Sequence, residues 1–168
     1  RQAEANDALQ KVADEDPEGT TGLLARSTLA VRERPEEALR LARRALEREP
    51  SHPLARVRIG SCLLNQGRPE EVLAEVDRHL LAVPDDQRAY LLRGIAHATA
   101  RRHDEALAAV DRSVALGEPQ PDPFALQLRA NLRALRSDPA GAIADLTRSV
   151  EARPTAAALL ARGRLHDE

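Results

Sequence analysis

The sequence predicts an all-α fold, a solenoid built from stacked antiparallel helix pairs. The first observation is a unit of about 34 residues that recurs along the chain: an apolar helix, a short turn, a second helix and a terminal proline. The second is the composition, which is 42% hydrophobic but only 1% aromatic. Apolar content supplied mostly by Ala, Leu and Val favours helices over a β-sandwich or barrel.

Apolar residues at helical spacing, and the prolines that stop each helix, place the elements in order. An opening half-repeat is expected at residues 1–17 and a closing partial repeat at 157–168. Four full repeats are expected between them, at about residues 19–52, 53–86, 87–120 and 123–156. We expect a single repeat domain over residues 1–168, cut from a longer protein, with a proline-rich insertion between the third and fourth repeats.

Acidic pairs open the second helix of three units, at Glu36–Glu37, Glu70–Glu71 and Asp104–Glu105. Paired carboxylates could serve as a general acid and base. Their recurrence at the equivalent helix start in three units indicates instead that they stabilise the positive end of the helix. Because no nucleophile motif or phosphate-binding loop accompanies them, we predict that the chain is not an enzyme and needs no cofactor.

Three kinds of position recur in phase. Small residues occupy the middle of the first helices at Gly60, Gly94 and Ala130, with Arg26 as the exception. The second helices begin with Ala38, Ala106 and Ala142, with Val72 as the exception, and the units close at Pro17, Pro50, Pro84 and Pro154. This pattern resembles the tetratricopeptide repeat family. The resemblance implies a right-handed superhelix in which the first helices line a concave groove.

The resemblance also implies the site and the function. The groove positions would be Leu54, Val57, Arg58, Ser61, Leu64, Asn65, Arg88, Leu91, Ile95, Gln127 and Asn131, preceded by Leu23 and Ser27 in the first repeat and followed by Leu135 in the fourth. An apolar floor with Arg and amide groups suits a peptide or helix of a protein partner, so we predict a protein–protein interaction scaffold. Alternatively these residues pack between repeats, and the array is a structural spacer or a self-associating segment. The family's chaperone-tail clamp lacks its lysines here.

Other kinds of site find little support in the sequence. His52, Cys62, His97 and His103 do not form a pair at metal-ligand spacing, so no metal site is predicted. A net charge of −2 gives no general attraction to nucleic acid. Apolar runs are too short for a membrane span, and the lone cysteine excludes an intrachain disulfide. We therefore expect a soluble protein, with the cytoplasm slightly favoured.

Overall fold

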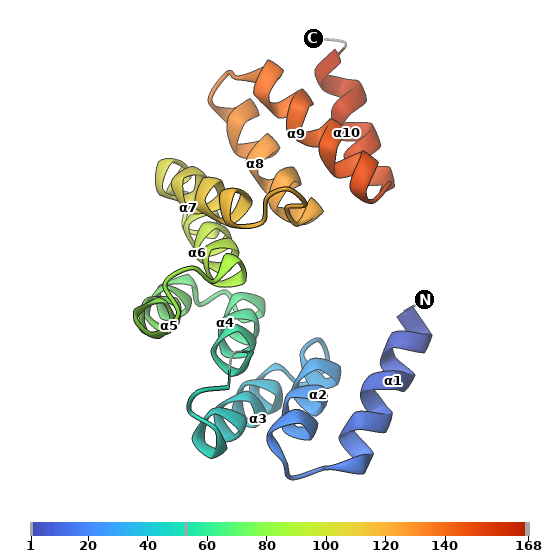
Figure 1. Cartoon of the computed structure of the whole chain (residues 1–168), viewed down its shortest axis with the longest axis vertical. Helices are drawn as coiled ribbons and strands as arrows, with labels where there is room; N and C mark the ends of the chain where they lie inside the picture. Colours follow the sequence, from blue (N-terminus) through green and yellow to red (C-terminus); the bar gives the residue numbers. More distant parts are fainter. Residues whose placement is uncertain (1, 53, 167–168) are drawn as a thin grey trace. The chain divides into compact units, whose positions relative to one another are not determined.

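The computed structural model describes residues 2–52 and 54–166, and within them it is entirely helical (Figure 1). The predicted all-α fold class is confirmed. The helices are α1 (Gln2–Glu15), α2 (Thr20–Ala30), α3 (Pro35–Arg48), α4 (Ala55–Asn65), α5 (Pro69–Ala82), α6 (Gln87–Thr99), α7 (His103–Leu116), α8 (Pro123–Leu135), α9 (Pro139–Ala152) and α10 (Ala156–His166). The predicted repeat limits at residues 1, 53 and 168 lie outside the described residues.

The helices form two compact units, divided between Ala82 and Val83. In the first unit, α2 pairs with α3 and α4 pairs with α5, while α1 packs against α2. In the second unit, α6 pairs with α7, α8 pairs with α9, and α10 lies beside α9 (Figure 1). Each predicted full repeat therefore corresponds to one helix pair. The single domain over residues 1–168 stays a prediction, since each unit is described by itself.

Apolar residues from the facing helices form a separate core in each unit. The first unit has a cluster of Leu23, Leu24, Leu41, Ala45 and Ala55. The second unit has one cluster of Ala106, Val110, Val114, Ala125, Leu126 and Leu132, and another of Ala130, Ala142, Leu146 and Ala158. Alanine is frequent in these clusters because small residues let paired helix axes approach closely.

Prolines and aspartates define where the helices begin. Pro35 and Pro139 lie in the first turn of α3 and α9, where the missing N–H has no intrahelical partner to lose. Asp86 accepts hydrogen bonds from the backbone N–H of Arg88 and Ala89 and so caps the start of α6. Asp122 and Asp138 accept comparable bonds at α8 and α9. Three helices of the second unit therefore start at an aspartate cap.

Candidate functional site

A mostly apolar cleft opens in the first unit between α1, α2 and the start of α4. Its volume is about 320 Å³. The lining residues are Leu9, Val12, Thr21, Leu24, Ala25, Thr28, His52, Leu54 and Arg58. Thr21, Leu24, Ala25 and Thr28 fall at i, i+3, i+4 and i+7 on α2, so one stripe of that helix forms a wall.

The burial of the α2 residues shows that the register expected for the first repeat is wrong. Ser27, not Arg26, occupies the small-residue position: it is fully buried and its hydroxyl donates to the carbonyl of Ala38 at 2.7 Å. Gly94 makes the equivalent contact, since a Cβ there would lie 3.4 Å from the carbonyl oxygen of Ala106. Leu23 is fully buried as well. The expectation that Leu23 and Ser27 face the groove is therefore wrong, and Leu24 and Thr28, one residue further along, take those places.

The connection between the paired helices explains this shift. Gly67, Arg101 and Ser137 adopt left-handed backbone conformations, with φ of 69°, 59° and 60°, in the later three turns. The turn between α2 and α3 has no such residue among those described, and the path from Ser27 to the start of α3 is one residue shorter than the path from Gly60 to the start of α5. The sequence contains the signal: Ser27, Gly60 and Gly94 each follow the preceding closing proline by ten residues.

Substitutions at neighbouring positions test this register. We expect Ser27→Val to lower the free energy of unfolding by about 2 kcal/mol, because it removes a buried hydrogen bond and adds a methyl group to a filled contact. Arg26→Val should cost less than about 1 kcal/mol, since Arg26 is half-exposed and pairs with Glu18 at the surface. Urea denaturation of both variants measures the difference. A larger loss at position 26 than at position 27 would contradict the assigned register.

Six predicted groove residues belong to α4 or to its start. Leu54 and Arg58 line the cleft, and Leu54 is 42% exposed. Ser61 donates to the carbonyl of Val57, and the amide of Asn65 donates to the carbonyl of Ser61. These two polar side chains thus bond within their own helix. Val57 and Leu64 are half-buried.

The predicted groove residues of the second unit have mixed surroundings. Leu91 packs against the core cluster of α7 and α8, and Gln127 donates to the hydroxyl of Ser149 at 2.9 Å. Ile95 is half-buried, whereas Arg88 and Asn131 are exposed. Their role in binding stays a prediction.

Two apolar side chains of α8 reach solvent, and of these Leu135 was a predicted groove residue whereas Phe124 was not. Phe124 is 48% exposed and Leu135 is 67% exposed. Phe124 lies one residue after the proline that begins α8, as Leu54 follows position 53 before α4. Counting from the small residues Gly60 and Ala130 would have aligned Leu54 with Phe124.

Burial shifts the pKa values of two side chains at or near this cleft, Arg58 and Cys62. Burial lowers the pKa of the Arg58 guanidinium, and a nearby Cys62 thiolate would oppose that effect. Burial raises the pKa of Cys62, with a smaller opposing contribution from its contact to the Ser27 hydroxyl. The Cys62 side chain is fully buried. A buried thiol whose pKa is raised is a poor nucleophile at neutral pH.

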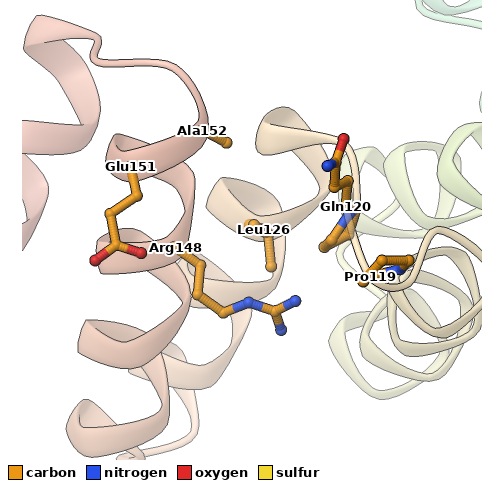
Figure 2. Close-up of a pocket in the computed structure, with 7 residues that line it drawn as sticks. Pro119, Gln120, Leu126, Arg148, Glu151 and Ala152 are labelled. Carbon is orange, nitrogen blue, oxygen red and sulfur yellow. The ribbon is translucent and has the colours of Figure 1, made fainter.

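A second cleft lies in the second unit, where the connection before α8 faces α9 (Figure 2). Its volume is about 460 Å³, and Pro119, Gln120, Pro121, Leu126, Arg148, Glu151 and Ala152 line it. Arg148 extends from α9 toward the connection, and its guanidinium donates to both carboxylate oxygens of Glu118 at 3.0 and 2.9 Å. The charge of Arg148 is therefore already neutralised by Glu118, which belongs to the predicted insertion.

Metal and membrane sites can be assessed over the described part of the chain. No group of three or more His, Cys, Asp or Glu side chains there is placed to hold a metal ion. None of the helices in those residues combines the length and the apolar content that crossing a bilayer would require.

Comparison with known proteins bears on the repeat pattern directly. Residues 32–96 match the family model of the tetratricopeptide repeat. Over this stretch the chain is therefore similar to the tetratricopeptide repeat. The stretch contains the second helix of one pair, the whole of the next pair and most of α6. The resemblance suggested by the small residues and closing prolines is thereby confirmed. No curated protein sequence matches the chain.

Solved structures extend the tetratricopeptide repeat fold beyond those residues. The chain is similar to the Cut9–Hcn1 hetero-tetramer of the APC/C, with a TM-score of 0.84 and 17% identity over 96% of this chain and 33% of that one. The protein TTC0263, a thermophilic tetratricopeptide repeat protein of Thermus thermophilus, gives a TM-score of 0.79 at 17% identity over 96% and 87%. The type IV pilus biogenesis factor PilW gives 0.76 at 23% identity over 96% and 75%. At these identities the similarity establishes the fold, and the chain spans about a third of the first structure.

Proposed function

We propose that this chain is a protein–protein interaction scaffold that holds a segment of a partner protein in the cleft between α1, α2 and α4. The observation that carries the proposal is the cleft itself, whose lining residues are mainly apolar. Leu54 is 42% exposed at its edge. A concave apolar site with a few convergent polar groups is the usual form of a binding pocket.

The size of the cleft indicates what can enter it. About 320 Å³ accommodates a few side chains of a peptide or helix rather than a whole protein surface. Amphipathic helices and extended peptides bind such grooves through apolar anchors spaced along one face. Among the similar structures, Cut9 and Hcn1 form a hetero-tetramer. That assembly is consistent with a scaffold role for the fold, although fold similarity alone does not transfer a partner.

A charge placed at the edge of the cleft tests the proposal. We expect Leu54→Glu to weaken capture of the partner from a lysate of the source organism on the order of tenfold, because a carboxylate would have to be desolvated against an apolar ligand. The matched control is Leu81→Glu at the end of α5, where the side chain is 86% exposed and lies outside the cleft. Quantitative mass spectrometry compares the proteins that each form retains.

The outcome separates the scaffold from the alternative roles. Loss of the same protein with Leu54→Glu but not with Leu81→Glu, at unchanged helical content, supports binding in the cleft. Equal capture by all three forms would contradict it. Capture of only further copies of the chain would favour self-association, for which Leu159 and Leu160 on α10, 43% and 64% exposed, offer apolar surface.

A further inference from the structure

His52 holds the backbone at the point where the cleft of the first unit meets the start of α4. Its side chain is half-buried and lines the cleft between α1, α2 and α4. The Nδ1 atom of its ring accepts a hydrogen bond from the backbone N–H of Leu54 at 3.2 Å, and its carbonyl accepts one from the N–H of Ala55 at 3.2 Å. The position of Leu54 at the edge of the cleft therefore depends on the imidazole of His52.

The start of α4 lacks the carboxylate contacts that other helices of this chain have. Leu54 occupies the N-cap position without a side-chain hydrogen bond to the helix, and the first turn of α4 contains no acidic residue. The starts of α6, α8 and α9 are capped by aspartates instead. An imidazole differs from a carboxylate because it changes its charge between about pH 5 and pH 8. The side-chain contact at the start of α4 is therefore made by a group that titrates near neutral pH.

Protonation of His52 is incompatible with its contact to Leu54. The Nδ1 atom of an imidazolium carries a hydrogen and acts as a donor, so it cannot accept the N–H of Leu54. The added charge would also lie near the positive end of α4. It would share the cleft with Arg58, whose pKa is already lowered by burial.

The elements around His52 offer no side chain that would offset this charge. Glu49 contacts His52 through its backbone carbonyl, and its own side chain is exposed. No carboxylate is among the residues that line the cleft. The residues that α1 and α2 contribute are all uncharged, namely Leu9, Val12, Thr21, Leu24, Ala25 and Thr28. Uptake of a proton therefore favours a conformation in which His52 has left Leu54.

We propose that His52 is a pH switch for the cleft, and that the cleft binds its partner segment only while the ring of His52 is neutral and bonded to the N–H of Leu54. This inference rests on the proposed function and adds its regulation. With a neutral ring, Leu54 is held at the edge of the cleft, where it contributes apolar surface to a bound segment. In mildly acidic solution the contact to Leu54 breaks, and a second cation lies beside an apolar ligand. Binding is therefore strong above the titration of His52 and is lost as the pH falls through it.

The binding test uses a fluorescent peptide that the chain selects from a random-sequence library at pH 7.5 and that the Leu54→Glu variant does not bind. Binding that requires a neutral histidine weakens about tenfold between pH 7.5 and pH 5.5, and we expect this factor for the native chain. His52→Asn should bind the peptide equally at both pH values, because the amide oxygen of asparagine can accept the N–H of Leu54 and does not titrate. His52→Ala lacks the acceptor and should bind weakly at both. The matched control is His103→Asn at the exposed start of α7, which should keep the tenfold factor.

Nuclear magnetic resonance of the ligand-free chain measures the contact without a peptide. The backbone amide resonance of Leu54 should follow the titration of the His52 ring, and it should stay constant over this pH range in His52→Asn. Circular dichroism at both pH values checks that the helices remain folded. A Leu54 amide resonance that does not follow His52 would overturn the switch. Peptide binding that depends on Leu54 but not on pH would overturn it as well and leave the proposed function standing. If no peptide binds in a Leu54-dependent manner, the proposed function falls and the switch with it.

Discussion

Replacing Asp145 with alanine is expected to lower the free energy of unfolding of the second unit by about 3 kcal/mol. The Asp145 side chain is 3% exposed. Its two oxygens accept bonds from Arg129 at 2.8 and 2.6 Å, and one of them accepts a bond from Arg133 at 2.9 Å. The variant would leave Arg129, whose side chain is 11% exposed, without its principal counter-ion. The Asp145 carboxylate also raises the pKa of Arg129, which shows how strongly the pair favours the charged form.

Asp111 provides the matched control because it contacts the same arginine from an exposed position. Its side chain is 47% exposed and lies 3.2 Å from Arg129. Surface pairs of this kind contribute at most about 1 kcal/mol, so Asp111→Ala should have a much smaller effect. Urea denaturation followed by circular dichroism measures both variants. Equal losses would show that Asp111, Arg129 and Asp145 act as a surface network, and that Arg129 and Asp145 do not act as a buried pair.

The helix-pair architecture could be predicted because its signals are local and periodic. Pro50 and Pro84 each prevent a helix from continuing. Gly60 follows Pro50 at the same distance at which Gly94 follows Pro84. Each of these signals comes from the backbone properties of a single proline or glycine and does not depend on contacts with distant residues. The fold therefore followed from the sequence before any contact was known, and only the register of the first repeat was wrong, by one residue.

The cleft between α1, α2 and α4 and the ion pair of Arg129 with Asp145 could not be predicted in the same way. Arg58 and Arg129 are both ordinary arginines on apolar helices when only their neighbours in sequence are considered. Asp145 lies on α9, on a different helix from Arg129, and packing alone decides that they meet. The lack of such a carboxylate among the described residues around Arg58 is likewise a property of three helices together. Long-range pairing of this kind has no periodic signal in one sequence.

The contact between α6 and α7 is the basis of the second large prediction. Gly94 is buried, and a Cβ added there would lie 2.4 Å from Cγ2 of Val110 and 3.4 Å from the carbonyl oxygen of Ala106. Val110 is fully buried and β-branched, so it has little freedom to move aside. We expect Gly94→Leu to lower the free energy of unfolding by about 3 kcal/mol, because the helices must separate to accommodate the added side chain.

Gly163 on α10 separates this packing effect from the helix propensity of glycine. A Cβ at Gly163 has no other atom within 4 Å, and the residue is exposed. Because leucine is a better helix former than glycine, Gly163→Leu should raise the free energy of unfolding by up to about 1 kcal/mol. Thermal and urea unfolding of both variants would then change in opposite directions for the same substitution. A stabilised Gly94→Leu variant would mean that α6 and α7 do not approach closely enough to need a glycine, and the small-residue positions would then lack the packing role assigned to Ser27, Gly60, Gly94 and Ala130.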